Sequence, residues 1–216
     1  MSFKAYAFDA YGTLFDVHAA VRRYADSLGP AGQRLSELWR IKQLEYSWVR
    51  SLMGSYTDFW RLTEEALDFA MSAIPGIDET MREPLLEAYW TLDCYPEVRD
   101  VLQRLRESGA ATAILSNGSP DMLDAAVTHA GVADLFDAVI SVDAVKTFKT
   151  SPQVYQMVTD TFALQPGEVS FQSSNRWDIA GAHKFGFHTV WINRSGQPNE
   201  YHNYGPAREI GDLTAL

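Results

Sequence analysis

Residues 3–15 read FKAYAFDAYGTLF, a short apolar run that ends on a carboxylate and is followed by a glycine turn. The run predicts a buried strand over residues 3–9. In an open α/β sheet, ligands bind beyond the carboxyl ends of the strands, so Asp9 stands where a functional side chain is expected. The residue two positions later is Tyr11 rather than a second acid. This favours a nucleophile at Asp9 over a metal ligand or an acid–base pair.

The chain on the carboxyl side of this stretch falls into two parts. Residues 16–93 carry helical patterns and no convincing strand, with helices expected over residues 16–28, 34–53, 58–73 and 78–89. The second of these places Ile41, Leu44, Trp48 and Leu52 on one apolar face. After Pro96, helices and strands alternate, and strands are expected over residues 110–115, 138–142, 169–171 and 188–192. The last 20 residues form a weakly patterned tail.

Alternating helices and strands are typical of a parallel sheet with crossover helices. The sequence therefore predicts an α/β fold with a Rossmann-like parallel core. The first strand belongs to a sheet that is completed later in the chain. We expect residues 1–15 and 94–216 to form the core and residues 16–93 to form an all-helical insertion.

Composition narrows the range of functions. The chain has 216 residues, 46% of them hydrophobic and 21% charged, which is enough for a sizeable core. A net charge of −10 argues against binding to nucleic acid or to an anionic membrane. Cys94 is the only cysteine, which excludes an internal disulfide and a thiolate metal cluster. With no secretory leader and no run of membrane-spanning length, we expect a cytoplasmic enzyme.

Polar side chains recur where each of the expected strands ends. Asp9 follows the first strand and Ser116-Asn117 the second. Lys146 and Lys149 lie just past the third, and Ser173-Ser174-Asn175 with Asp178 follows the fourth. Because parallel strands end at one edge of a sheet, we expect these groups to converge on one crevice.

This set resembles the haloacid dehalogenase (HAD) superfamily, whose motifs are a strand-end Asp, a Ser or Thr, a Lys and a final acidic group. Most of its members are phosphatases, with a second Asp in the first motif and paired acids in the fourth that hold Mg²⁺. Here Tyr11 replaces that second Asp, and Ser173-Ser174-Asn175 leaves only Asp178 in the fourth motif. A halide leaves without a proton, and a haloalkanoate needs no divalent cation. A phosphate ester needs both a proton for its leaving group and a divalent cation for its charge.

Within that superfamily the chain resembles the L-2-haloacid dehalogenases over nearly its whole length, including the insertion, which that family uses as a cap. The motifs that carry the resemblance are Asp9-x-Tyr11-Gly12-Thr13, Trp39-Arg40-x-Lys42-Gln43-Leu44-Glu45-Tyr46, Tyr56-x-Asp58-Phe59-Trp60, Lys149 with Tyr155, Ser173-Ser174-Asn175-x-Trp177-Asp178 and Trp191-Ile192-Asn193-Arg194. One departure is Thr150, where the family usually has proline after its lysine. Because of this departure, Lys146 stays a second candidate for the family's lysine, although the spacing to Tyr155 favours Lys149.

The resemblance implies a role for each matching residue. Asp9 attacks C2 of a 2-haloacid and displaces halide, and water then hydrolyses the aspartyl ester to a 2-hydroxy acid of inverted configuration. Lys149 keeps Asp9 ionised, while Asp178 activates the water. The remaining residues would assist. Asn175 and Ser173 act with Asp178, and Ser116 binds the substrate carboxylate. The departing halide is received by Arg40, Asn117 and Phe59. An apolar wall is formed by Tyr11, Leu44, Phe59 and Trp177, and the site is supported through hydrogen bonds by Thr13 and Tyr155.

The resemblance further implies that no cofactor or metal is needed and that the protein is a homodimer, while the acidic net charge predicts no nucleic-acid or membrane partner. Two alternatives stay open. One is a Mg²⁺-dependent phosphatase of the same superfamily, and the other is a non-catalytic binding protein. Taken singly, several residues have plain structural interpretations. An Asp before Gly often shapes a turn, and Asn175 could simply cap a helix. Neither a Gly-x-Ser-x-Gly elbow nor a phosphate-binding glycine loop occurs.

Overall fold

In a computed structural model the chain forms a parallel six-stranded sheet in the order β3-β2-β1-β4-β5-β6. The structure describes residues 3–216, so residues 1 and 2 of the expected core lie outside the described part. The strands are β1 (Ala5–Phe8), β2 (Ala111–Ser116), β3 (Ala138–Ser141), β4 (Val169–Ser173), β5 (His188–Ile192) and β6 (Arg208–Ile210). The predicted α/β fold with a parallel sheet is confirmed.

The strand order reverses at β1, which pairs with β2 on one side and with β4 on the other. Ala5 is in register with Ala111 and with Val169. A reversal of this kind opens a crevice at the carboxyl ends of the two central strands. Asp9 and Ser173 stand at those two ends and are buried.

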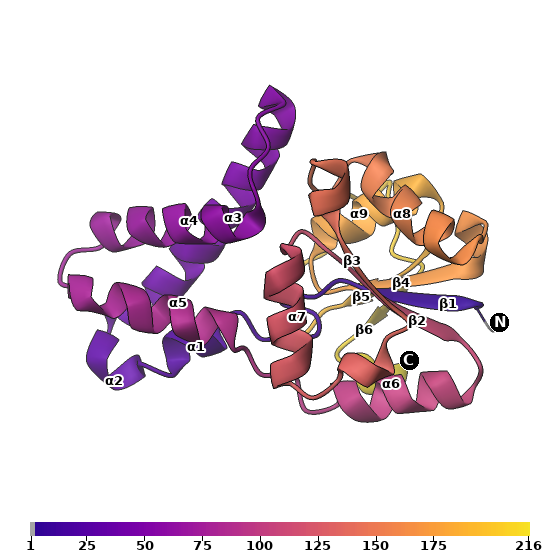
Figure 1. Cartoon of the computed structure of the whole chain (residues 1–216), viewed down its shortest axis with the longest axis horizontal. Coiled ribbons are helices and arrows are strands. Elements are labelled where there is room, and N and C mark those ends of the chain that lie inside the picture. Colours follow the sequence, from indigo (N-terminus) through magenta and orange to yellow (C-terminus); the bar gives the residue numbers. More distant parts are fainter. Residues whose placement is uncertain (1–2) are drawn as a thin grey trace.

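Four helices cover the sheet, namely α6 (Val98–Glu107), α7 (Pro120–His129), α8 (Pro152–Phe162) and α9 (Arg176–Phe185). Helix α6 lies on one face of the sheet, and α8 and α9 lie on the other (Figure 1). The start of α7 is fixed locally, because Pro120 occupies its first turn and the Ser119 hydroxyl accepts a hydrogen bond from the amide of Met122 at 3.4 Å.

The helical insertion lies beside the core and touches it at α7 and near the end of α3 (Figure 1). Its helices are α1 (Ala19–Arg22), α2 (Ala25–Leu28), α3 (Ala31–Met53), α4 (Phe59–Ala73) and α5 (Arg82–Trp90). Short 3₁₀ segments complete the chain at Glu79–Met81, Ala133–Leu135, Val142–Val145, Pro166–Glu168 and Leu213–Ala215.

The chain leaves the core and returns to it at neighbouring points. Phe15 and Cys94 form an isolated antiparallel bridge, and the amide of Tyr95 donates to the carbonyl of Leu14 at 2.9 Å. The amide of Asp16 donates to the carbonyl of Asp93 at 3.4 Å. These contacts support the division that we propose, with a cap of residues 16–93 and a core on either side of it.

Helix α3 buries a different face from the apolar one in its sequence. Ile41 and Leu52 are 57% and 89% exposed, whereas Trp39 and Gln43 are buried. The reason is α4, against which α3 packs. The indole of Trp39 donates to the carbonyl of Thr63 at 2.8 Å, and the amide of Gln43 donates to the hydroxyl of the same threonine at 3.0 Å. The hydrophobic pattern of the sequence, used alone, therefore predicts the wrong buried face for this helix.

Two other expectations about local structure were wrong. The single helix expected over residues 16–28 is two short helices, because Tyr24 leaves the helical region at φ −114° and ψ 25°. The weakly patterned tail contains β6, which pairs with β5. A strand of three residues is too short for its alternation to stand out in the sequence.

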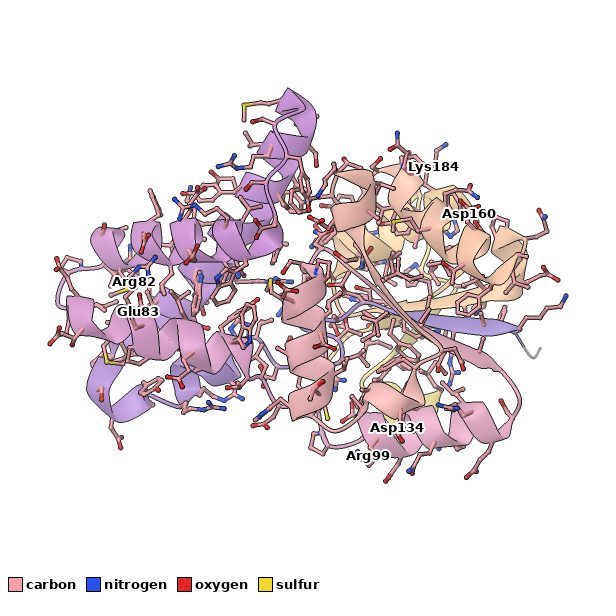
Figure 2. All side chains as sticks on the ribbon, viewed as in Figure 1. Arg82, Glu83, Arg99, Asp134, Asp160 and Lys184 are labelled. Carbon is pink, nitrogen blue, oxygen red and sulfur yellow. The ribbon has the colours of Figure 1, made fainter. Side chains whose placement is uncertain are left out.

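Charged side chains lie around the outside of both parts. Figure 2 shows Arg82 and Glu83 on the cap and Asp160 and Lys184 on the helical layer of the core. Among residues 3–216, no helix has the length and apolar character that a membrane crossing requires.

Candidate active site

The carboxylate of Asp9 stands at the reversal of strand order, and its two oxygens have different environments. Oδ2 accepts three hydrogen bonds, from Thr13 Oγ1 at 2.9 Å, Ser173 Oγ at 3.3 Å and Asn175 Nδ2 at 2.7 Å. Oδ1 accepts one, from Lys149 Nζ at 3.0 Å. The side chain is thus held firmly by one oxygen, while the other keeps free acceptor capacity.

Lys149 joins the two carboxylates of the site. Its Nζ lies 3.0 Å from Asp9 Oδ1 and 2.7 Å from Asp178 Oδ2, and its side chain is only 1% exposed. Burial by itself lowers the pKa of Lys149, but the carboxylates of Asp178 and Asp9 outweigh burial and hold the pKa above its ordinary value. A cation is therefore fixed between two buried acids.

The competing lysine is excluded by geometry. Lys146 lies at the surface, where its Nζ pairs with Asp143 at 2.7 Å. The spacing to Tyr155 favours Lys149 in the sequence, and Lys149 is also the lysine that lies beside Asp9 in the structure. Its backbone is held as well, because the Lys149 amide donates to Asn117 Oδ1 at 3.0 Å.

Asp178 is fully buried and lies on the far side of Lys149 from Asp9. The hydroxyl of Tyr155 donates to Asp178 Oδ1 at 2.8 Å. Burial raises the pKa of Asp178 from 3.8 to about 6, although Lys149 opposes the rise and Asp9 adds to it. Burial, together with Asp178, also raises the pKa of Tyr155 well above its ordinary value, so the phenol keeps its proton and remains a donor.

A small cavity opens onto Asp9 between cap and core. It offers about 10 Å³ to the centre of a water molecule, which is room for about one water. Three of its walls, Arg40, Leu44 and Phe59, come from the cap helices α3 and α4. Its full lining is Asp9, Tyr11, Arg40, Leu44, Phe59, Ser116, Asn117 and Trp177.

Apart from Lys146, the structure brings together the candidate site residues singled out in the sequence. Those that bond to Asp9 or Asp178 are Thr13, Lys149, Tyr155, Ser173 and Asn175. The guanidinium of Arg40 donates to the carbonyl of Tyr11 at 3.1 Å, which fixes a cation at the cavity wall. Asn175 begins α9, but its side chain makes no capping bond and points to Asp9 instead.

Two supporting residues were missed in the sequence. Tyr89, at the end of α5, stacks on Tyr11 with ring centroids 5.7 Å apart and an interplanar angle of 13°. Gly181, on α9, leaves space for Tyr155. A Cβ at Gly181 would collide with the Tyr155 hydroxyl and would lie 2.8 Å from Thr150 Cβ. Neither residue belongs to a local motif, because both act through contacts between distant segments.

We expect Gly181→Ala to lower the turnover number about tenfold or more and to lower the melting temperature. The added methyl must displace Tyr155 from Asp178 or Thr150 from its place, and overpacking of this kind costs about 1–3 kcal/mol. Gly167→Ala is the matched control, because a Cβ at that glycine meets no atom within 4 Å. Initial rates and a thermal melt provide the check, and a Gly181→Ala protein as active and stable as the control would contradict it.

Comparisons with known proteins agree with the geometry. The family model for haloacid dehalogenase-like hydrolases matches residues 3–186. The (S)-2-haloacid dehalogenase 1 of Pseudomonas sp. (strain CBS-3) is 48% identical over 215 residues, covering 99% of this chain and 94% of the relative. The (S)-2-haloacid dehalogenase 4A of Burkholderia cepacia is 45% identical over 216 residues, covering 100% of this chain and 94% of the relative.

A solved structure shows the same likeness in three dimensions. The L-2-haloacid dehalogenase of Xanthobacter autotrophicus with chloropropionic acid covalently bound superimposes with a TM-score of 0.88 at 38% identity, covering 98% of this chain and 95% of that one. The resemblance found in the sequence is confirmed. The chain therefore belongs to the haloacid dehalogenase-like hydrolases and, within them, to the L-2-haloacid dehalogenase family.

Proposed function

We propose that the protein is a hydrolytic dehalogenase of short (S)-2-haloalkanoic acids. The observation that carries this proposal is the pairing of Asp9 with Lys149 beside a small cavity whose walls combine the apolar side chains of Leu44 and Phe59 with the cation of Arg40. A carboxylate that is paired with a buried ammonium and shielded from bulk water is a competent nucleophile towards carbon. The names of the close relatives support the same chemistry.

In the first step Asp9 Oδ1 forms a bond to C2 of the substrate, and the C2–halogen bond breaks with its electron pair going to the halide. Attack from the side opposite the halogen inverts the configuration at C2. Oδ1 fits this part because, among residues 3–216, Lys149 alone donates a hydrogen bond to it. Arg40, Asn117 and Phe59 line the same cavity and would receive the departing halide, while Ser116 would hold the substrate carboxylate.

In the second step water attacks Cγ of Asp9, and the bond between Cγ and the ester oxygen breaks. Asp178 takes a proton from the water and returns it to the departing alkoxide, so the 2-hydroxy acid leaves with the old Asp9 oxygen, and the second proton of the water is released to solvent as the Asp9 carboxylate is restored. Negative charge develops on Oδ2 during this attack. Thr13, Ser173 and Asn175 already donate to Oδ2, so they are placed to stabilise that charge without rearrangement. One halide and one proton are released for each water consumed.

The experiment that tests the function is an assay of halide release with both enantiomers of 2-chloropropionate, with and without EDTA. We expect release from the (S) enantiomer only, unchanged by the chelator. The matched control is p-nitrophenyl phosphate. Phosphate release that EDTA abolishes, with no halide from either enantiomer, would establish the phosphatase alternative instead.

We also propose that catalysis needs no metal. The paired acids that hold Mg²⁺ in the phosphatases of the superfamily are replaced here by Ser173-Ser174-Asn175, and Asn175 Nδ2 donates to Asp9 Oδ2 at 2.7 Å. The positive charge beside Asp9 Oδ1 comes from Lys149 Nζ at 3.0 Å, and the substrate carries a single negative charge. We place the enzyme in the cytoplasm, where its one cysteine and lack of disulfides suit a reducing environment.

The raised pKa of Asp178 predicts a dependence on pH. Below its pKa of about 6 the carboxyl group is protonated and cannot accept a proton from water. We expect turnover to fall as the pH drops through about 6, approaching tenfold for each further pH unit. Steady-state halide release between pH 8 and pH 4.5 measures this fall in turnover. Asp178→Asn is the control, because its low residual rate should show no fall near pH 6. A flat wild-type profile between pH 7 and pH 5 would argue against Asp178 as the base.

We further propose that the protein is a homodimer joined through the outer face of α3. That face presents Ile41, Val49, Leu52 and Met53 to solvent, exposed by 57%, 44%, 89% and 64%. These side chains form an apolar stripe that Glu45 interrupts between Ile41 and Val49, and exposed apolar surface on a helix marks a candidate interaction site. A second copy offers the same stripe, and a symmetric pairing of the two would cover both.

We expect Leu52→Glu to convert the dimer to a monomer, because it places a charge at the most exposed position of the stripe. Light scattering coupled to size-exclusion chromatography measures the mass directly. Val139→Glu is the control, since Val139 is 41% exposed on β3 of the core, away from α3. A wild-type protein that elutes as a monomer would refute the proposal.

A further inference from the structure

Trp177 separates the catalytic cavity from a second, larger hollow. It lines the small cavity over Asp9 and also a groove of about 590 Å³ on the outer side of α9. Among the described residues that line either space, Trp177 is the one that both share. The side chain of Trp177 therefore borders both the cavity over Asp9 and the groove.

The groove has the chemistry of a site for an alkyl chain. Its lining is mostly apolar or aromatic, with one cation from Lys184 at the outer surface of α9 (Figure 2). One face of α9 provides its floor, because residues three, four and seven positions after Trp177 all line it. The complete lining is Trp48, Thr150, Pro152, Trp177, Ala180, Gly181, Lys184, Phe185, Tyr201 and Tyr204.

A second tryptophan, from the cap, holds this partition in place. Trp48 on α3 meets Trp177 edge to face, with ring centroids 5.5 Å apart and an interplanar angle of 84°. Leu44 lies one helical turn earlier on α3 and lines the cavity, whereas Trp48 lines the groove. The cap helix thus contributes to both sides of the partition.

We propose that Trp177, supported by Trp48, limits the length of the 2-haloacid side chain, and that the groove behind it receives a longer chain when the partition is removed. This proposal rests on the proposed dehalogenase function. The cavity has room for about one water, so any bound 2-haloacid must enlarge it, and a longer side chain needs more added space than a short one. Trp177 is the wall behind which apolar space already exists.

The test compares halide release from (S)-2-bromopropionate and (S)-2-bromohexanoate by Trp177→Ala, Trp48→Ala and the wild type. We expect the ratio of kcat/KM for the longer acid to that for the shorter acid to rise at least tenfold in Trp177→Ala. In Trp48→Ala we expect a rise of about threefold, because Trp177 loses its support but remains. Trp90→Ala is the matched control, since Trp90 forms a similar edge-to-face pair with Trp60 inside the cap and lines neither space.

A binding measurement separates failure of this proposal from failure of the dehalogenase function. Hexanoate and propanoate do not react, and their affinities can be compared by calorimetry in the same variants. If the wild type releases no halide, the dehalogenase function fails, and a tenfold gain for hexanoate over propanoate in Trp177→Ala still supports the partition. Trp177→Phe provides a milder change if Trp177→Ala fails to fold. Length ratios equal to those of the wild type in both the rate and the binding measurements would overturn the proposal.

Discussion

Asp9→Asn is expected to abolish halide release from (S)-2-chloropropionate, with a loss of roughly 10⁴-fold or more. The amide has nearly the same shape as the carboxylate, yet it carries no negative charge to attack carbon. The hydrogen bonds from Thr13 and Ser173 to Oδ2 can persist, so the fold should survive the change. An ion-selective electrode measures the release, and circular dichroism checks the fold.

Asp137→Asn is the control for this substitution. Asp137 accepts a hydrogen bond from the amide of Thr112 at 2.8 Å and lies outside the site, so its removal should leave the rate near that of the wild type. Turnover in ¹⁸O-labelled water adds a direct test of the mechanism. Under single-turnover conditions the label should enter the side chain of Asp9. Label that appears only in the hydroxy acid would contradict a covalent route through Asp9.

Asp178→Asn is expected to stop the reaction halfway. Asp9 and Lys149 remain in contact, so halide leaves once per site, but no carboxylate is left to take a proton from the water. We expect a burst of halide equal to the enzyme concentration, followed by turnover reduced by roughly 10²–10⁴-fold, the usual effect of losing a general base. Mass spectrometry of the digested protein should find the Asp9 peptide carrying one 1-carboxyethyl group.

Lys184→Ala provides the control for that experiment, because Lys184 lies on the same helix, α9, but at its outer surface. It should turn over without a burst and without an adduct. Absence of the adduct from Asp178→Asn, combined with slow halide release from the first turnover onwards, would show that Asp178 acts before the ester forms.

The sequence predicted the parts of the molecule that depend on local patterns. Four runs of apolar residues, each ending in polar side chains, were enough to predict a parallel sheet with its site at one edge, because parallel strands impose that geometry. The resemblance extended the prediction to cap residues such as Arg40 and Phe59, which no periodicity would have singled out. The structure brings them to the cavity of Asp9.

The features that the sequence did not reveal depend on contacts between distant segments. The buried face of α3 is set by α4, through two hydrogen bonds to Thr63. Tyr89 joins the site by stacking on Tyr11, 78 positions away in the chain. The strand β6 forms only because β5 offers it an edge. In each case the partner, rather than the residue's own surroundings in sequence, decides the outcome.

The paired segments at Phe15 and Cys94 have a consequence for how such a protein can evolve. Because both ends of the helical unit meet, the unit can be lengthened, shortened or exchanged for another while every ladder of the sheet stays intact. Asp9 and Lys149 lie outside this unit. Arg40, Leu44 and Phe59 lie on it, so an exchange of the unit would change the walls of the cavity and the groups proposed to receive the halide, while Asp9 and Lys149 stay in place.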